Sequence, residues 1–551
     1  DAGDRRDSGS EDLDADAAGD DTDGSFGAPS PEPRRQGGRY RRDNEDTAEY
    51  RRANPPGELA PRPRPAYGLT VEEEMGDESP TMVDCIPNDI WDHVYSVQAM
   101  TGARPGATCK NHPTMTQAMA GPRAAVYQAA MESEIEQCKT EEVWDLVRTA
   151  DLPAGSVPLP CSMVLTDKAV DTGDGKTTAT KTKARLVAGG HRQVEGRDYD
   201  STWAPVVSFS ILRLLLAFAC THGYTVTQVD FTGAYLNAKL IGDMPVYMRQ
   251  HSRFEQLGPN GEKGYYTCKL NKALYGLKQS GRLWHQTLTT YMRSYGFEPT
   301  KMDPCVFVYH KGDKWIVVWA YVDDLGIFSN DEATKEQFIE DLTSKYKVTN
   351  EGPIQYYLGV NIQKSGNTVA LDQRKYIGEL LEEFSMDKEP HFHVTTPMAD
   401  VPNTDATPLD EEQASTYRRM VGCLVYIATM TRPDVAYAVS CVSRHLHAPA
   451  VMDRKAVKRI YRYLRHTKDE TLVYSSPDAG IELVSDSNFS NCKETARSTT
   501  ALVLIMFGSP VYWKSIRQQV VALSTTEAEY MAMCAALQAL LFISQFLEEL
   551  G

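Results

Sequence analysis

Three aspartates in two separated segments are the residues of this chain best suited to metal-dependent chemistry. Asp230 lies in "QVDFTGAYL", directly after a valine, and Asp323 and Asp324 interrupt the apolar run "KWIVVWAYVDDLGIFS". Clustered carboxylates repel one another unless a cation neutralises them, and Mg²⁺ prefers oxygen ligands of this kind. An isolated Asp-Asp pair more often only forms a turn, so the pair alone leaves both interpretations open.

The segments around these aspartates decide whether they can meet. Residues 225–236 favour a strand, and residues 314–329 favour two strands joined by a tight turn that carries the pair. If the strand and the hairpin are neighbours in one sheet, the three carboxylates converge. Helical spacing of apolar residues predicts helices at 125–147, 210–223, 280–297 and 331–346. The mixture of helices and strands without regular alternation predicts an α+β fold.

The ends of the chain differ in composition from its middle. Of the 551 residues, the first 80 contain 21 acidic and 11 basic residues and no Ile, Trp or Cys, which predicts a disordered acidic and Pro-rich linker. The net charge of −17 argues against a simple nucleic-acid binder but does not exclude a local basic groove. Residues 376–470 favour helices, and residues 481–530 favour three strands followed by a long helix from about 525 to 550.

Cysteines and apolar runs bear on the compartment. The 11 cysteines are scattered without a CxxC pair, which favours a reducing, intracellular setting. The group Cys441, His445 and His447 lacks a second cluster that would complete a zinc site, so a helix end is the preferred interpretation. The apolar stretch 211–220 is too short to cross a bilayer, so we expect no membrane.

Several motifs occur in one order that resembles the reverse transcriptase of copia-type LTR retrotransposons. They are "KARLVAGGHRQ", "QVDFTGAYLNAKL", "ALYGLKQSGRLW", "DPCVF", "YVDDLGIF" and "YYLGVNI". The resemblance continues through "YRRMVGCLVYIATMTRPDVAYAV", "SDSNFS" and "YWKSIRQQVVALSTTEAEYMA" and covers about residues 125–551. The family departs from this chain at Gly189, Gly281 and Met163, where it usually has Lys, Pro and Trp. These differences concern local packing and affinity in the fingers.

The resemblance implies a right-hand polymerase with fingers, palm and thumb, followed by an incomplete RNase H-like α/β domain. The implied organisation begins with a disordered linker at 1–80, and fingers and palm span 81–365. A mostly helical thumb and connection spans 366–475, and the N-terminal part of the RNase H-like domain spans 476–551.

The same resemblance assigns roles to residues of the polymerase site. It implies that Asp230, Asp323 and Asp324 are the catalytic ligands of two Mg²⁺ ions, with Mn²⁺ as an alternative. Tyr235 would lie under the sugar and exclude a 2′-hydroxyl by its bulk; the alternative is a tyrosine of the core.

Further residues are assigned to the nucleotide and the primer. Arg185 and Lys183 would hold the triphosphate, since guanidinium and ammonium groups suit phosphate; the alternative is a solvated strand face. Gln279 would touch the nucleotide–template pair. The hairpin of Tyr356, Tyr357, Leu358 and Gly359 would be the primer grip.

The implied function is RNA-directed DNA polymerisation by two-metal transfer of a nucleotide from dNTP to a primer 3′-hydroxyl. The implied partners are an RNA template, a DNA or tRNA primer, dNTPs and the remainder of a Pol polyprotein. The implied location is intracellular, in cytoplasmic virus-like particles with a nuclear step. Two alternatives stay open: a decayed or repurposed relic that binds nucleic acid without polymerising, and an interaction protein that uses its tail.

The C-terminal segment resembles the start of an RNase H domain. Asp486 and Glu529 match two of its metal-binding carboxylates, whereas the family's next Asp lies beyond the point where this chain stops, at Gly551. Glu548 and Glu549 would be a solvated helix end. We therefore expect no cleavage of RNA in a hybrid.

Overall fold

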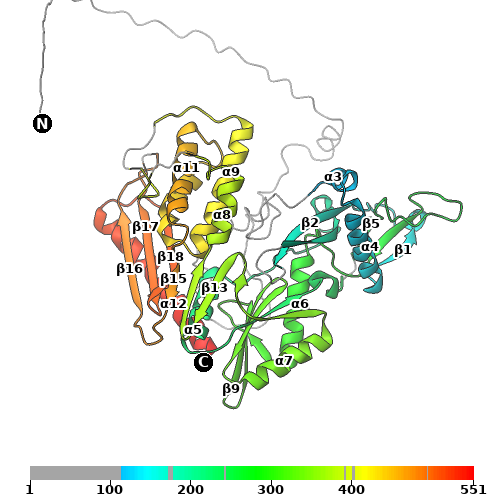
Figure 1. Cartoon of the computed structure of the whole chain (residues 1–551), viewed down its shortest axis with the longest axis horizontal. Coiled ribbons are helices and arrows are strands. Elements are labelled where there is room, and N and C mark those ends of the chain that lie inside the picture. The colour runs from blue at the N-terminus through cyan, green and yellow to red at the C-terminus, as the bar shows by residue number, and fades with distance from the viewer. Residues whose placement is uncertain (1–112, 172–177, 241–243, 390–392, 400–403, 493) are drawn as a thin grey trace, which may run out of the picture. The chain divides into compact units, whose positions relative to one another are not determined.

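The computed structural model describes residues 113–551, except 172–177, 241–243, 390–392, 400–403 and 493 (Figure 1). The chain divides into two units, residues 1–78 and 79–551. The linker predicted at 1–80 lies outside the described residues, so this prediction stays a prediction. The described part contains both helices and antiparallel sheets, as the sequence predicts.

The first elements build a small layer of helices and strands. They are α3 (Met115–Ala120), α4 (Ala124–Thr140), β1 (Trp144–Arg148), β2 (Cys161–Asp171), β3 (Thr178–Ala188), β5 (Tyr247–Arg249) and β6 (Tyr266–Leu270). Strands β2 and β3 form a long antiparallel hairpin, and β1, β6 and β5 form a separate sheet. Tyr127, Met131 and Ile135 of α4 pack on Leu165 and Leu186 of the hairpin.

The helix predicted at 125–147 is too long. Helix α4 ends at Thr140, and Trp144–Arg148 instead pairs antiparallel with Tyr266–Leu270. Glu142 adopts a positive φ of 52°, which a helix cannot continue. Apolar spacing alone could not locate this end, because the partner strand lies far away in the sequence.

A six-stranded antiparallel sheet is the centre of the molecule. Its order is β11 (Val348–Pro353), β4 (Thr227–Phe231), β10 (Asp324–Ser329), β9 (Lys314–Tyr321), β8 (Val306–Lys311) and β7 (Phe297–Pro299). Helices α6 (Ser280–Tyr295) and α7 (Glu332–Lys345) cover one face, and α5 (Phe209–Thr221) covers the other. Strand β9 is therefore buried on both faces, which explains why its sequence is apolar without alternation.

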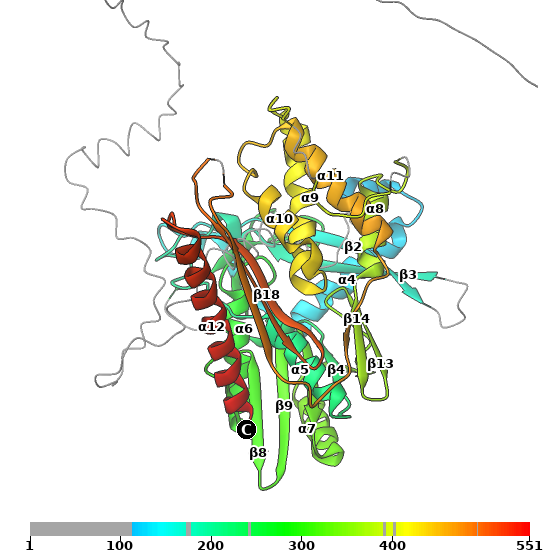
Figure 2. The ribbon, with the colours of Figure 1, turned by 90° about the vertical axis from the view of Figure 1, so that its left-hand side faces the viewer.

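A second sheet and four helices follow. The sheet order is β12 (Tyr356–Tyr357), β13 (Val360–Ser365), β14 (Thr368–Asp372) and β15 (Leu472–Tyr474). The helices are α8 (Arg374–Glu383), α9 (Glu411–Met430), α10 (Ala436–Ser443) and α11 (Val451–His466), and they lie together in Figure 2. The helical character predicted for 376–470 is confirmed.

The C-terminal part is a three-stranded sheet with one long helix. Strands β16 (Glu482–Asn488), β17 (Thr499–Met506) and β18 (Ser509–Arg517) are antiparallel in this order, and α12 (Thr525–Leu550) packs along them (Figure 2). The three predicted strands and the helix are confirmed. Helix α12 is also long and apolar enough to cross a membrane, which the sequence analysis overlooked. Its alanines at 528, 532 and 536 are buried, whereas Met533, Leu537 and Leu541 are exposed.

Arg213 and Glu549 are among the residues that join the C-terminal part to the rest of the described chain. The buried Arg213 guanidinium donates to the carbonyls of Thr429 (2.5 Å) and Val511 (3.1 Å) and lies 3.9 Å from the centre of the Trp513 ring. Burial lowers the pKa of Arg213 to about 10. The Glu549 carboxylate accepts the backbone N–H of Lys301 (2.7 Å). The prediction that Glu549 belongs only to a solvated helix end is wrong, because its carboxylate caps a remote turn.

Candidate active site

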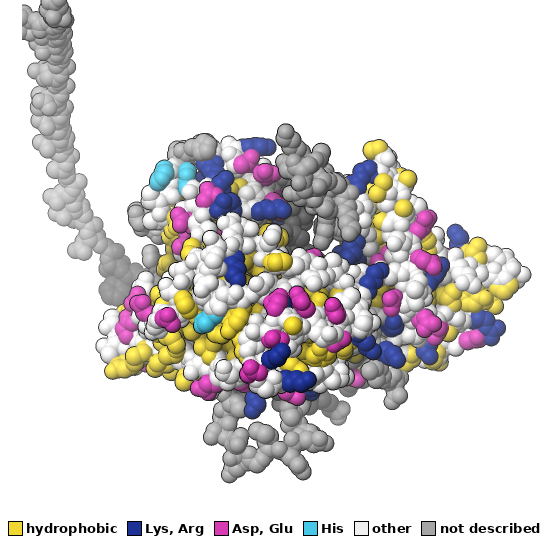
Figure 3. Space-filling view, turned by 60° about the horizontal axis from the view of Figure 1, so that its bottom comes forward, with side chains coloured by type: hydrophobic (Ala, Val, Ile, Leu, Met, Phe, Trp, Pro, Cys, Tyr) yellow, Lys and Arg dark blue, Asp and Glu magenta, His cyan; other side chains and the backbone are white. Residues whose placement is uncertain are grey.

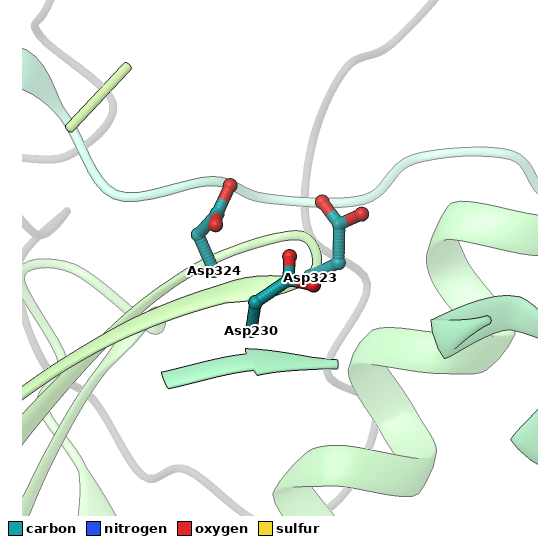
Figure 4. A group of neighbouring side chains, drawn as sticks. All are labelled: Asp230, Asp323 and Asp324. Carbon is teal, nitrogen blue, oxygen red and sulfur yellow. The ribbon is translucent and has the colours of Figure 1, made fainter. Parts of the chain in front are cut away.

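The register of the central sheet brings the three aspartates to one place. Asp324 is directly opposite Asp230 in the antiparallel pair β10–β4, and Asp323 lies in the turn that precedes β10. One carboxylate oxygen from each lies within 4.8 Å of the others, and all three side chains stand on the same side of the sheet (Figure 4). No other group of three or more His, Cys, Asp and Glu residues is placed for metal binding among the residues that the structure describes.

The turn that carries Asp323 is tight and strained. Tyr321 and Asp324 are cross-strand partners, so Val322 and Asp323 form a two-residue turn. Val322 adopts a φ of 57°. A β-branched residue rarely adopts this conformation, and such strain costs about 1–3 kcal/mol. The surrounding structure has to hold this turn in place.

Three separate elements hold the turn through successive backbone carbonyls at residues 322–324. The indole N–H of Trp284 donates to the first carbonyl (2.7 Å), and the backbone N–H of Phe231 donates to the second (2.8 Å). The hydroxyl of Tyr357 donates to the third (3.1 Å). Helix α6, strand β4 and the Tyr356–Gly359 hairpin thus fix the position of the aspartate pair.

The glycine of "YVDDLGIF" is required by packing. Gly326 pairs with Trp319 across β9 and β10. A Cβ atom at Gly326 would lie 2.1 Å from ring atoms of Trp319, which real contacts do not allow. The Trp319 ring can therefore lie over the backbone beside the aspartates only because residue 326 has no side chain.

The predicted sugar and triphosphate residues are connected through a tyrosine that the sequence analysis missed. Tyr235 lies on a 3₁₀ helix, Ala234–Asn237, and its ring meets the Tyr275 ring edge-on, with centroids 5.2 Å apart. The Arg185 guanidinium lies 5.3 Å from the centre of the Tyr275 ring. Burial raises the pKa of Tyr275, the Arg185 charge opposes this, and the Asp323 charge adds to it. The sequence signal that could have identified Tyr275 is its position in the motif "ALYGLKQS".

A buried acid supports the strand that carries Lys183 and Arg185. Glu134 of α4 is only 8% exposed, and its Oε1 accepts the backbone N–H of Leu186 (2.9 Å). Burial raises the pKa of Glu134, and the bond from Leu186 and the charges of Arg185 and Lys183 partly offset this. Nε of Arg185 is buried without a hydrogen-bond partner in the structure. Sequence reasoning missed Glu134, because a glutamate on a helix usually faces solvent.

Gln279 lies beneath the surface at the start of α6. Its amide Oε1 accepts from Gln193 (2.9 Å), and its Nε2 donates to the carbonyl of Asp198 (3.0 Å). Both ends of the amide are therefore used within the protein. The prediction that Gln279 touches the nucleotide–template pair would require these bonds to exchange, and in this structure Gln279 positions the loop at 193–198.

The four residues predicted as a primer grip form one hairpin. Leu358 and Gly359 have φ values of 50° and 82°, which are typical of a tight two-residue hairpin turn. Tyr357 is 1% exposed and points toward the aspartate turn, whereas Tyr356 is 42% exposed, with the Lys375 ammonium 5.4 Å from its ring centre. The Tyr426 hydroxyl donates to the carbonyl of Leu358. The hairpin is thus tied to both the central sheet and α9.

The two carboxylates predicted for a nuclease site are arranged differently. Asp486 is exposed on β16, and side chains alternate along a strand, so it points away from the face of Leu483 and Ser487. Leu483 packs with α12, and the Ser487 hydroxyl donates to Glu529 of α12 (2.8 Å). The structure therefore places Asp486 and Glu529 on different sides of β16.

Cys441, His445 and His447 lie at and after the end of α10. His445 contacts the carboxylate of Asp453 through Nδ1, and this contact raises the pKa of His445. Cys441 and His447 belong to no group that could hold a metal ion.

Comparisons with known proteins agree with this geometry. Residues 141–400 match the family described as "Reverse transcriptase (RNA-dependent DNA polymerase)". These residues contain the three aspartates and the hairpins that hold them, and they form a reverse transcriptase domain.

The matching curated relatives are transposon proteins. The chain is 33% identical over 448 residues to the retrovirus-related Pol polyprotein from transposon TNT 1-94 of Nicotiana tabacum, covering 80% of this chain and 33% of that protein. It is 33% and 31% identical to those from transposons RE1 and RE2 of Arabidopsis thaliana, covering 77% and 83% of this chain and 28% and 31% of those proteins. The chain belongs to this family of Pol polyproteins and spans about a third of these relatives' length. The family predicted from the motifs is confirmed.

Proposed function

We propose that this chain is the RNA-directed DNA polymerase of a copia-type retrotransposon and transfers nucleotides from dNTPs to a primer 3′-hydroxyl. The observation that carries the proposal is the convergence of Asp230, Asp323 and Asp324 in adjacent strands. In this proposal the six-stranded sheet is the palm, and α3, α4 and the β2–β3 hairpin belong to the fingers. Helices α8–α11 belong to the thumb and connection, and β16 to α12 begin an RNase H-like domain.

The donor set of the three aspartates fits hard divalent cations. Each offers a carboxylate oxygen, and these oxygens lie within 4.8 Å of one another. Mg²⁺ is commonly bound by carboxylates together with substrate phosphates, so two Mg²⁺ ions, or Mn²⁺ in their place, would be held here. Such a pair of ions, when bound, stabilises both the attacking and the leaving oxygen.

The protein's own residues would orient the nucleotide. Arg185 and Lys183 lie on the β3 strand, where they would contact the triphosphate. The Tyr235 ring would form the floor beneath the sugar, and Tyr275 would keep that ring and Arg185 in contact. The Tyr356–Gly359 hairpin would place the primer end, because Tyr357 joins it to the aspartate turn.

The proposed substrates are an RNA template with a DNA or tRNA primer and dNTPs. The proposed partner is the remainder of the Pol polyprotein, and the proposed location is cytoplasmic virus-like particles inside the cell, with a nuclear step. These follow from the family to which the chain belongs.

Primer extension tests the proposal. Purified chain is given an RNA template, an annealed DNA primer, Mg²⁺ and labelled dNTPs, and is compared with Asp323→Asn. The matched control is Asp313→Asn, because Asp313 lies exposed in the turn between β8 and β9. We expect extension by the wild type and the control and none by Asp323→Asn. A folded wild type that binds primer and template without extending would instead support the inactive relic.

A further inference from the structure

A cavity of about 720 Å³, whose lining includes none of the three aspartates, lies beside strand β18 and helices α9 and α10. Its volume falls within the range of about 300–1,000 Å³ that is typical of ligand sites. The walls include Phe209 of α5, Val439 of α10, and Tyr512 and Trp513 of β18. On the face in Figure 3, basic and acidic side chains are interspersed, so net charge does not mark a binding surface there.

Five cationic side chains line this cavity, and one of them, Arg213, donates to backbone carbonyls. The other four are Arg444 after α10, Arg497 in the segment between β16 and β17, and Lys514 and Arg517 of β18. Within the described ranges, none of the four forms an ion pair with an acid. Like charges that gather without a counter-charge repel one another. The group therefore favours a ligand that brings negative charge.

Arg444 and Arg517 meet at one end of β18, whereas Lys514 lies on the opposite face of that strand, because side chains alternate along it. Arg444 contacts the Thr499 hydroxyl (3.4 Å), and Arg517 is the cross-strand partner of Thr499. An Arg517 nitrogen lies 3.5 Å from the sulfur of Cys492. These contacts are long or weakly polar, so the guanidinium groups keep donors for a ligand. Guanidinium groups present forked donors that suit phosphate oxygens.

The rest of the lining suits flat rings. Tyr512 lies half-buried at the wall, with the Lys514 ammonium 5.4 Å from its ring centre. Val439, Ile516 and Met531 add apolar surface. Single-stranded nucleic acids are bound by this combination of cationic groups for the backbone and aromatic rings on which bases stack.

We infer that this cavity binds one or two unpaired nucleotides of a nucleic-acid strand, in a site separate from the three aspartates. The inference rests on the proposed function for its ligand class, because a polymerase chain encounters unpaired template. Arg444, Arg497 and Arg517 contact the phosphates, and Tyr512 contacts a base.

Binding is measured first, without catalysis. The full chain is titrated against a fluorescent oligothymidylate by anisotropy over a range of salt concentrations, without divalent ions. The double variant Arg444→Gln with Arg517→Gln is compared with Arg253→Gln with Lys263→Gln, which removes two charges from the exposed segment between β5 and β6. We expect Kd to rise about tenfold or more only in the first variant, with a shallower salt dependence, by about 0.7 for each lost phosphate contact.

Photo-crosslinking locates the strand in the wild type and needs no variant to fold. An oligonucleotide that carries 4-thiouridine is crosslinked, and the modified peptides are identified. We expect crosslinks within 510–520 and 436–444. Equal binding by both double variants, or crosslinks only outside these segments, overturns the inference. Equally effective competition by oligoglutamate also overturns it and points to an acidic protein partner.

The outcome is independent of primer extension. Asp323→Asn keeps the cavity intact and is expected to bind the oligonucleotide as the wild type does. If the wild type does not extend primers but binds the oligonucleotide through the cavity, only the proposed function is contradicted. If the wild type extends primers and the Arg444 and Arg517 double variant binds the oligonucleotide as tightly as the wild type does, only the proposed cavity site is contradicted.

Discussion

The carboxylates predicted to bind metal lie on or beside two sheets of this molecule, and only the central sheet brings them together. In the central sheet, Asp324 pairs directly with Asp230, and the turn adds Asp323. In the C-terminal sheet, Asp486 is exposed on one side of β16, whereas Glu529 contacts Ser487 on the other. Register and side-chain direction, and not the presence of acids in a motif, separate a candidate metal site from two surface acids.

The two regions also differ in what holds them. The turn in the central sheet receives hydrogen bonds on three successive carbonyls from Trp284, Phe231 and Tyr357. Asp486 lies on β16, which is an edge strand of its three-stranded sheet. Pre-organisation of reacting groups depends on such surrounding contacts, so we expect substitutions in the first region to have larger effects.

The largest effect is expected from Asp230→Asn, with Asp486→Asn as its matched control. Removal of a group that only orients a metal ligand costs about 10–100-fold, so loss of a ligand itself should cost primer extension more than about 100-fold. Asp486→Asn should leave the rate unchanged. The rates are measured by single-nucleotide incorporation. Equal losses of incorporation rate in Asp230→Asn and Asp486→Asn would contradict the assignment of the metal site to the central sheet alone.

Gly326→Ala is expected to have the next largest effect. The new methyl group would meet the Trp319 ring at 2.1 Å, so the ring or the strand has to move. Overpacking of this kind costs about 1–3 kcal/mol of unfolding free energy. The control is Gly378→Ala, where nothing lies within 4 Å of the new atom, and a helical Gly-to-Ala change should stabilise by up to about 1 kcal/mol. Urea unfolding measures both, and a neutral Gly326→Ala would contradict the packing argument.

Tyr357→Phe tests the third carbonyl anchor. The variant keeps the ring and removes only the hydroxyl that donates to Asp324, which should cost about 0.5–1.5 kcal/mol. The extension rate should fall as well, because the aspartate turn becomes less fixed. Tyr356→Phe, on the exposed neighbour, should leave the free energy of unfolding unchanged. A loss of stability without a change in rate would limit Tyr357 to a structural role.

Much of this site could be predicted, and the missing parts share one cause. Local patterns located β4, the β9–β10 hairpin and α6, and the motifs identified the three aspartates. The roles of Trp284, Tyr275 and Glu134 depend on partners that lie far away in the sequence, so no local pattern reveals them.

The errors have the same origin as the omissions. The helix predicted to residue 147 ends early because Trp144–Arg148 pairs with a strand more than a hundred residues later. Glu549 was assigned to solvent, although it binds the backbone of Lys301. Periodicity reports which face of an element is apolar, but it does not report which remote segment will satisfy a polar group.

Replacement of Glu134 by Gln is expected to change the free energy of unfolding by a smaller amount, and this change depends on pH. Its folded pKa is raised by burial, so the folded state binds the proton more tightly than the unfolded state. The stability that results is present at low pH and is lost as the pH rises through the folded pKa. Glu134→Gln keeps an acceptor for Leu186 but does not titrate. We therefore expect the variant to gain stability relative to the wild type as the pH rises toward neutral.

Glu134→Ala separates this charge effect from the hydrogen bond. The alanine leaves the buried N–H of Leu186 without an acceptor, which should cost about 1–3 kcal/mol. Denaturant unfolding at several pH values gives the free energy of unfolding as a function of pH for the wild type, Glu134→Gln and Glu134→Ala. A difference between wild type and Glu134→Gln that stays constant with pH would contradict the raised pKa.

The smallest effect is expected from Glu529→Gln. The Glu529 carboxylate only accepts an exposed hydrogen bond from Ser487, and exposed substitutions usually change stability by less than about 0.5 kcal/mol. Primer extension should be unchanged. Because Asp486 and Glu529 lie on different sides of β16, we also expect this chain to leave the RNA of an RNA–DNA hybrid intact in Mg²⁺ or Mn²⁺. Cleavage that disappears in Glu529→Gln would show that the C-terminal carboxylates act together after all. Both regions would then bind metal, and they would differ only in their affinity for it.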